Sequence, residues 1–183
     1  MTDTLFTNAK LIDPEQGTVT LGAIAVTDGK ISAIITDGAA LPEARKTVDC
    51  TRKHLAPGIV DIGVKVCEPG ERHKESFGSA GLAAAAGGVT TMVTRPDTDP
   101  VIDNPETLEF VIRRAREAAP VNVLPMAALT KGRAGREMTE IGFLLDAGAV
   151  AFTDCDHVVT DRKVFGRALS YARSLGALVL GHP

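Results

Sequence analysis

From residue 55 onward the sequence alternates between short apolar runs rich in β-branched residues and longer segments whose apolar side chains have helical spacing. The short runs cover residues 59–66, 89–94, 121–126, 150–153 and 177–180. Repeated β-α units of roughly 30 residues predict a parallel sheet with right-handed crossover connections. This alternation restricts the chain after residue 53 to a layered α/β architecture.

The segments between these runs carry recognisable helix ends. A helix expected at 76–86 ends at a Gly-Gly pair, where glycine adopts the left-handed cap conformation. Asn104, followed by a proline, predicts the start of a second helix as its N-cap. Further helices are expected at 138–145 and 160–176 because their apolar residues recur at helical spacing.

Two architectures have this rhythm, the open doubly wound sheet and the closed (β/α)8 barrel. A phosphate-binding glycine loop after the first strand would favour the open sheet, but 68–71 reads Glu-Pro-Gly-Glu and is no GxGxxG. We therefore predict an α/β fold, a (β/α)8 TIM-type barrel truncated after about four and a half units. Its first and last strands would be open edges, so we expect either a longer natural chain or a covering partner, and favour a fragment.

Residues 1–53 have a different pattern and predict a small antiparallel β-domain, which leaves 54–183 as the partial barrel. The sequence Thr-Asp-Gly at 27–29 lies between two alternating apolar runs, which is a strong hairpin signal. Another short strand is expected at 47–50. A sheet of this size needs a neighbouring surface to pack against.

Composition excludes several classes of function. The 183 residues carry 20 basic and 23 acidic side chains, a net charge of −3 and no Trp, which argues against nucleic-acid or anionic-membrane partners. Three cysteines (Cys50, Cys67 and Cys155) without paired spacing do not form a disulfide framework. The sequence predicts neither a signal peptide nor an apolar run of the about 20 residues that a membrane span needs. We therefore expect a cytoplasmic protein.

In a barrel, the chemically active groups lie at the C-terminal ends of the strands. We therefore expect one rim to carry a set of charged and sulfur side chains, whereas Arg113, Arg114 and Arg116 are expected on the solvated face of a helix. The rim set comprises Lys65, Cys67, Glu68, Arg95, Asp97, Thr130, Lys131, Asp154, Cys155, Asp156, His157 and His182.

A series of short motifs, in this order and spacing, resembles the bacterial dihydroorotases of the amidohydrolase superfamily. The resemblance implies the barrel, a flanking β-domain formed by the first 53 residues, and a family reaction in which zinc-bound water hydrolyses a ring amide. It covers nearly the whole chain. The motifs are Ala-Pro-Gly-Ile-Val-Asp at 56–61, Glu-Pro-Gly at 68–70, Lys-Glu at 74–75, Ala-Ala-Ala-Ala-Gly-Gly-Val-Thr-Thr at 83–91, Pro-Asp-Thr at 96–98, Ala-Leu-Thr-Lys-Gly at 128–132 and Ala-Val-Ala-Phe-Thr-Asp at 149–154.

The departures from the family pattern are concentrated after Asp61. There the family has His-x-His, its two first-strand zinc ligands, followed by an Arg for the substrate carboxylate. This chain has Gly63, Lys65 and Cys67 at these positions. Glycine offers no ligand atom and an ammonium group has no free lone pair. A cysteine cannot donate two parallel hydrogen bonds to a carboxylate as a guanidinium does.

Other family positions are retained only in part. The substrate-binding Asn of the family corresponds to Asp97, the metal-bridging Asp to Asp154 and the third zinc histidine to His182. The fourth histidine and the general-base Asp of the family would lie beyond residue 183. We therefore assign no catalytic residue and expect no cofactor, because Asp154 and His182 are insufficient to hold zinc.

Two interpretations of the remaining side chains stay open. Lys65 either pairs with Asp154 in place of the metal or is a solvated rim lysine. A replacement zinc site of Cys67, Cys155, Asp154 and His182 is the less favoured alternative, since its cysteines lack CxxC clustering.

The resemblance therefore predicts a pseudo-dihydroorotase of pyrimidine biosynthesis. Its function would be that of a non-catalytic assembly partner of aspartate transcarbamoylase, or a self-associating scaffold. The alternative is an active zinc-dependent dihydroorotase, or another cyclic amidohydrolase that cleaves a ring amide bond.

Overall fold

The chain divides into two compact units, Met1–Pro57 and Gly58–Pro183, in a computed structural model that describes residues 1–36 and 38–181. The sequence predicted a boundary between residues 53 and 54. The observed boundary lies four residues later in the chain, because β5 (His54–Leu55) pairs with the first strand, β1 (Thr2–Asp13), and so belongs to the first unit.

The N-terminal unit is a sheet with strand order β3-β2-β1-β4, and β5 pairs with β1. β2 covers Thr18–Thr27, β3 covers Lys30–Thr36 and β4 covers Ala44–Asp49. Between β2 and β3, Asp28 and Gly29 have φ values of 51° and 71°. Positive φ at both central residues is what a type I′ hairpin requires, so the predicted hairpin is confirmed.

The prediction that this sheet is antiparallel is wrong for two of its pairings. β1 pairs with β2 in the antiparallel direction but with both β4 and β5 in the parallel direction. After the hairpin, the chain crosses from the β3 edge to the opposite edge beside β1. A crossover of this kind brings a strand back in the parallel direction, whereas a tight turn cannot.

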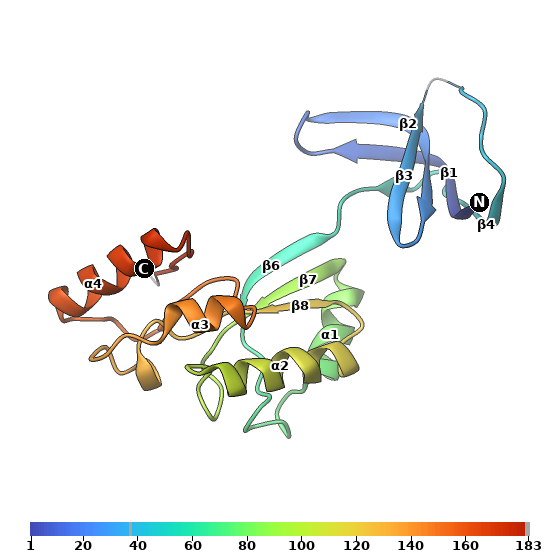
Figure 1. Cartoon of the computed structure of the whole chain (residues 1–183). Helices are drawn as coiled ribbons and strands as arrows, with labels where there is room; N and C mark the ends of the chain where they lie inside the picture. Colours follow the sequence, from blue (N-terminus) through green and yellow to red (C-terminus); the bar gives the residue numbers. More distant parts are fainter. Residues whose placement is uncertain (37, 182–183) are drawn as a thin grey trace. The chain divides into compact units, whose positions relative to one another are not determined.

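The second unit contains a parallel sheet in the order β6-β7-β8 (Figure 1). Its strands are Ile59–Val64, Val89–Thr94 and Asn122–Pro125. The predicted parallel direction is confirmed for these strands, because each pairing has a parallel register.

The segments predicted as fourth and fifth strands are shorter than expected. Phe152 forms parallel bridges with Ala127 and with Val179. Within the described residues, neither segment forms a ladder longer than these single bridges. Backbone hydrogen bonds flank the bridges, including Ala127 N to Ala151 O at 2.9 Å. Both segments therefore continue the parallel order beyond β8, with pairing centred on a single residue.

In the described part of this unit, four α-helices connect and cover these segments: α1 (Phe77–Ala86), α2 (Pro105–Ala118), α3 (Ile141–Asp146) and α4 (Arg162–Ser174). Three of them begin after a side chain that accepts a hydrogen bond from the first turn, which satisfies a free backbone N–H. These N-caps are Ser76, Asn104 and Asp161.

The third helix starts at Ile141, later than the predicted residue 138. The reason is that the residues before it bond to the preceding loop. Thr139 donates its hydroxyl to Ala128 O at 2.8 Å and its backbone N–H to Leu129 O at 3.1 Å. Met138 forms an antiparallel bridge with Thr130, so neither residue is free to adopt helical bonding.

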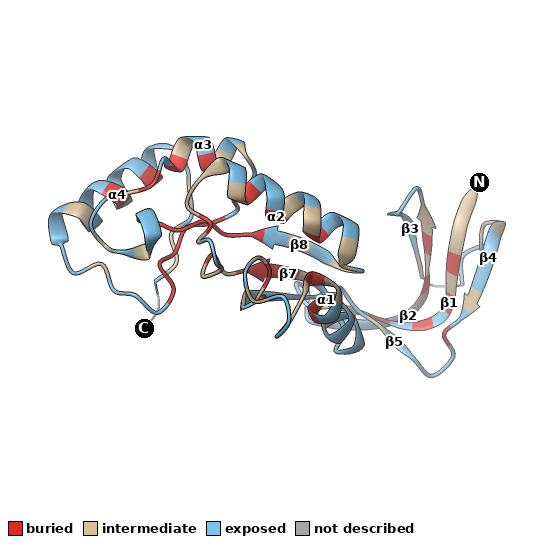
Figure 2. Cartoon of the chain, turned by 90° about the horizontal axis from the view of Figure 1, so that it is seen from below, coloured by how far each residue is buried: buried red, intermediate tan, exposed pale blue. Residues whose placement is uncertain are grey.

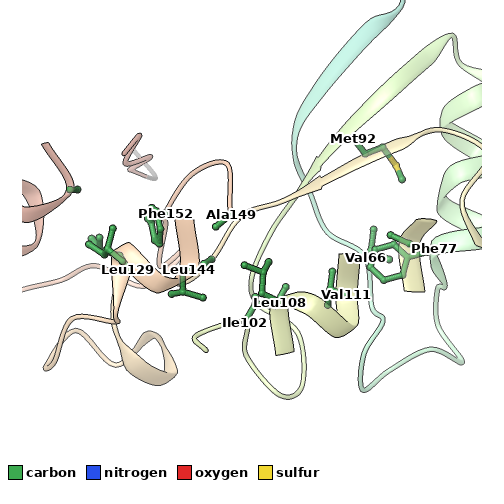
Figure 3. Close-up of a cluster of buried hydrophobic side chains, with 14 of the residues drawn as sticks. Val66, Phe77, Met92, Ile102, Leu108, Val111, Leu129, Leu144, Ala149 and Phe152 are labelled. Carbon is green, nitrogen blue, oxygen red and sulfur yellow. The ribbon is translucent and has the colours of Figure 1, made fainter. Parts of the chain in front are cut away.

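The main core lies between the helices and one face of the parallel sheet. Figure 2 shows the buried positions of α2 and α3 on the side of each helix that faces the sheet. Figure 3 shows the side chains themselves, with Phe77, Val66 and Met92 close together and Leu108 and Val111 beside them. Burial of these apolar side chains supplies the main driving force for packing the helices on the sheet.

The opposite face of the sheet is covered only in part. Val93, Met126 and Ala151 form a small buried cluster there, with Leu180 against it. On β6, Val60 and Ile62 are 55% and 64% exposed.

Candidate functional site

A cavity of about 390 Å³ lies at the C-terminal ends of the parallel strands. A larger hollow of about 840 Å³ lies at the opposite ends of the strands, and among the described residues that line it only Arg116 is charged. The smaller cavity is the candidate site, because Arg95 lines it and pairs with Asp97, which also pairs with Lys65. Its lining residues are Ile62, Gly63, Arg95, Met126, Thr153, Cys155, Leu180 and Gly181.

Gly63, at the first predicted metal position, lies in a distorted part of β6. The pairing register between β6 and β7 shifts between Ile62 and Val64, and Gly63 has a φ of 91°. L-amino acids rarely adopt this conformation, although a Cβ at this position would meet no atom within 4 Å. The backbone therefore suits glycine here, and a histidine would be strained even though space exists for it.

Lys65, at the second predicted metal position, is bound to Asp97. Lys65 Nζ lies 3.0 Å from Asp97 Oδ2, and the side chain of Asp97 is only 5% exposed. Arg95 donates to both oxygens of the same carboxylate, from Nε at 3.2 Å and from Nη2 at 2.9 Å. Two cations thus enclose one buried carboxylate, and the proposed pairing of Lys65 with Asp154 is wrong.

Asp154 has a different set of partners. Its Oδ1 accepts the backbone N–H of Thr130 at 2.9 Å and its Oδ2 accepts the hydroxyl of Thr130. Both residues are buried. The Thr130 hydroxyl oxygen also accepts the backbone N–H of Gly135 at 2.8 Å. The Asp154 carboxylate therefore joins two loops at the rim through hydrogen bonds to neutral groups, and its backbone carbonyl accepts Arg133 Nε at 3.2 Å.

A second carboxylate extends the ionic network. Asp156 Oδ1 forms an ion pair with Arg133 and lies 3.8 Å from Arg95 Nη2. A hydrogen bond from its own backbone N–H, followed by the charges of Arg133 and His157, lowers the pKa of Asp156 despite a smaller opposing effect of desolvation. Arg133 was missed by the sequence reasoning. Its place in the Lys-Gly-Arg loop after the third strand was the available signal.

Cys155 lines the cavity but is not an activated nucleophile. Burial, and then the negative charge of Asp97, raise the pKa of its thiol, although Arg95 acts in the opposite direction. A thiol with a raised pKa is mostly protonated near neutral pH, and the thiolate is the reactive form. Cys155 also has a φ of 56°, which is unusual for a residue with a Cβ.

The proposed mixed zinc site is only partly visible. One of its four predicted ligands, His182, lies outside the described residues. Within residues 1–36 and 38–181, no three or more His, Cys, Asp or Glu side chains are grouped so that they could hold a metal ion.

Glu68 follows the first strand, as expected, but its side chain is part of the helix packing. It accepts the backbone N–H of Phe77 at 2.9 Å and Arg114 Nε at 2.7 Å, with Arg72 Nε at 3.5 Å. The prediction that Arg114 is a solvated helix residue is therefore wrong. Burial opposes ionisation of Glu68, but these hydrogen bonds and charges outweigh it and lower its pKa.

The fold matches solved structures of a hydantoinase and of a deacylase. L-hydantoinase (dihydropyrimidinase) from Arthrobacter aurescens has a TM-score of 0.84 and 23% identity over 100% of this chain and 41% of that chain. An N-acyl-D-glutamate deacylase from Bordetella bronchiseptica, solved with zinc and a phosphonate inhibitor, has a TM-score of 0.67 and 18% identity over 99% of this chain and 45% of that chain. The chain therefore has an α/β amidohydrolase-type fold with a small N-terminal β unit.

The sequence comparisons define the family. The model of the dihydro-orotase-like family matches residues 52–182. Dihydroorotases from Geobacter metallireducens and Bacillus cytotoxicus are 35% and 40% identical over 178 residues, which is 97% of this chain. The chain belongs to the dihydroorotase-like family, as its motifs predicted. It spans 42% and 41% of the length of these two relatives.

No helix among the described residues is long and apolar enough to cross a membrane.

Proposed function

We propose that this chain is a dihydroorotase-like protein of the pyrimidine pathway that has lost catalysis and serves as a non-catalytic assembly partner of aspartate transcarbamoylase. In this proposal, β6, β7 and β8, with the segments at Phe152 and Val179, are the first part of a (β/α)8 barrel. The parallel order of these segments supports that assignment.

The observation that carries the proposal is the chemistry of the predicted metal positions. Gly63 supplies no donor atom, and the ammonium of Lys65 is paired with Asp97 at 3.0 Å. Asp154 is a possible ligand, but both of its oxygens accept hydrogen bonds from Thr130. These donors do not fit the zinc that the family resemblance implies, because a cation occupies one ligand position and a glycine the other.

Loss of the metal would remove the central step of the family reaction. Metal-assisted hydrolysis depends on lowering the pKa of water to about 7 and on polarising the scissile carbonyl. Removal of a single residue that only orients a ligand typically reduces affinity or activity by about 10–100-fold. Replacement of two direct ligands is a larger change, and no described residue near the cavity replaces their imidazoles.

The proposed substrate positions support the same conclusion. Cys67 stands where the family has an Arg for the substrate carboxylate, and Asp97 stands where it has an Asn. An ionised carboxylate only accepts hydrogen bonds and repels an anionic substrate. Both changes would weaken binding of a carboxylate-bearing ring amide.

The partner and the location rest on the resemblance and the composition. Pseudo-dihydroorotases are associated with aspartate transcarbamoylase, and self-association is the alternative assembly. A net charge of −3 supports neither a nucleic-acid nor a membrane partner. We propose the cytoplasm as the location, because three cysteines without paired spacing suit a reducing compartment.

Catalysis by an active zinc-dependent dihydroorotase, or by another cyclic amidohydrolase, is the second candidate. It is favoured by Asp154, which is kept at the bridging position and held in place by Thr130. The relatives at 35% and 40% identity that carry the name dihydroorotase also favour it.

Metal analysis separates the two candidates. The protein expressed from its complete gene should be purified in zinc-containing buffer, dialysed, and assayed for bound zinc and for dihydroorotate hydrolysis. The Bacillus cytotoxicus relative, treated identically, is the control. We expect far less than one zinc per chain and no turnover. Stoichiometric zinc together with turnover would reject the proposal in favour of an active enzyme.

The assembly is tested with the same protein. We expect it to co-elute with the aspartate transcarbamoylase of its own organism in size-exclusion chromatography. Elution as a separate species would contradict the proposed partner, whether or not zinc is bound.

A further inference from the structure

The candidate site contains an ion pair between two positions at which the chain departs from the family pattern. Lys65 follows β6 and Asp97 follows the neighbouring strand β7. Their charged groups are 3.0 Å apart, with side-chain exposures of 52% for Lys65 and 5% for Asp97. Lys65 stands at a predicted metal position and Asp97 at a predicted substrate position.

We propose that Lys65 and Asp97 are a mutually dependent pair, in which a lysine at the metal position is stable in the fold because a carboxylate stands at the substrate position. The assignment of Lys65 to a metal position and of Asp97 to a substrate position rests on the proposed function. The ion pair itself rests only on the geometry of these side chains.

The charge balance of the rim explains the dependence. Asp97 and Asp156 lie among the cations Lys65, Arg95 and Arg133. An amide in place of the Asp97 carboxylate would leave the three cations with one carboxylate. Loss of the lysine charge alone would leave two cations with two carboxylates. Loss of the Asp97 charge therefore leaves cations close together without enough carboxylates to neutralise them. Loss of the Lys65 charge leaves equal numbers of positive and negative groups.

The two cations contact Asp97 in different ways. Arg95 donates two hydrogen bonds to the carboxylate and its side chain is 24% exposed. Lys65 makes a single, half-exposed contact with it. Arg95 therefore holds the carboxylate in position, and Lys65 completes its neutralisation. Because water screens a half-exposed ammonium, removal of Lys65 alone should be the milder change.

A double-mutant cycle tests the dependence in the protein expressed from its complete gene. The variants are Lys65→Met, Asp97→Asn and their combination, with the equilibrium constant of unfolding measured in urea. We expect Lys65→Met to raise this constant about threefold and Asp97→Asn to raise it tenfold or more. In the Asp97→Asn background, Lys65→Met should lower the constant, so that the two effects deviate from additivity by about tenfold, or 1.4 kcal/mol.

A matched control pairs Lys65→Met with Glu109→Gln. Glu109 is exposed on α2, so this combination should be additive. Additive effects of Lys65→Met and Asp97→Asn would overturn the proposal.

A second measurement does not depend on the folding of any variant. In the unaltered protein, acylation of lysines by acetic anhydride should be several-fold slower at Lys65 than at Lys163, an exposed residue near the start of α4. Equal rates would also overturn the pair. Stoichiometric zinc with intact coupling would reject only the proposed function, whereas additivity without zinc would reject only this inference.

Discussion

Replacement of Glu68 by Gln tests a buried ionic contact that links two helices. The Glu68 carboxylate joins the first turn of α1, through Phe77 N, to α2, through Arg114. The Gln side chain has one acceptor oxygen, so it can keep only one of these two hydrogen bonds. Its NH2 group then faces the other donor, either Phe77 N or Arg114 Nε. The change removes the negative charge and alters the volume little.

The magnitude follows from the contacts. A hydrogen bond to a charged group contributes about 1.5–3 kcal/mol, and a buried group left without a partner adds to the loss. The Arg114 side chain is 26% exposed, so water compensates for part of it. We expect the free energy of unfolding to fall by about 2–3 kcal/mol. For 183 residues this lowers Tm by roughly 4–12 °C.

Thermal unfolding followed by circular dichroism measures this shift, with Glu109→Gln as the control for loss of an exposed carboxylate. The control should change Tm by less than about 1 °C, because exposed substitutions of this kind are nearly neutral. A Glu68→Gln variant that unfolds within about 1 °C of the parent would refute the assignment of Glu68 to helix packing.

Two further predictions concern the same groups and the loop at Thr130. Because the pKa of Glu68 is lower in the folded chain than its ordinary value of 4.5, its stabilisation is complete above that pH and is lost as the pH falls through the folded-state pKa. The difference in Tm between the parent and Glu68→Gln should therefore shrink when measured from about pH 7 to about pH 3. Thr130→Val removes the hydroxyl that bonds Asp154 and Gly135, and should lower the free energy of unfolding in urea by about 1–3 kcal/mol. An unchanged urea midpoint would show that neither bond contributes to stability.

The features predicted correctly from the sequence depend on neighbouring residues. The hairpin at Asp28-Gly29 follows from residues that tolerate positive φ, and the start of α2 follows from Asn104 before a proline. The parallel direction of β6, β7 and β8 follows from the helices between them, since a crossover returns the chain to the same end of the sheet. Each of these signals is complete within a short stretch of chain.

The incorrect predictions concern partners that are distant in the sequence. β4 was expected in an antiparallel sheet and the residues of β5 were assigned to the partial barrel, but the edge that each strand joins depends on where the preceding strands already lie. Arg114 was predicted to be a surface residue because its position on the helix lies away from the apolar face. That position does not show that Glu68, 46 residues away in the sequence, packs against it. The third helix begins late because Thr139 bonds to the loop before it.

The sequence by itself determined the α/β class, the dihydroorotase-like family and the absence of imidazoles at residues 63 and 65. These properties depend on residue identity and on periodicity along the chain. Only the tertiary structure decided that Lys65 pairs with Asp97, that Thr130 holds Asp154, and that Gly63 lies in a left-handed conformation. The physical reason is that ion pairs form between groups a few ångströms apart, and the register between neighbouring strands decides which groups come that close.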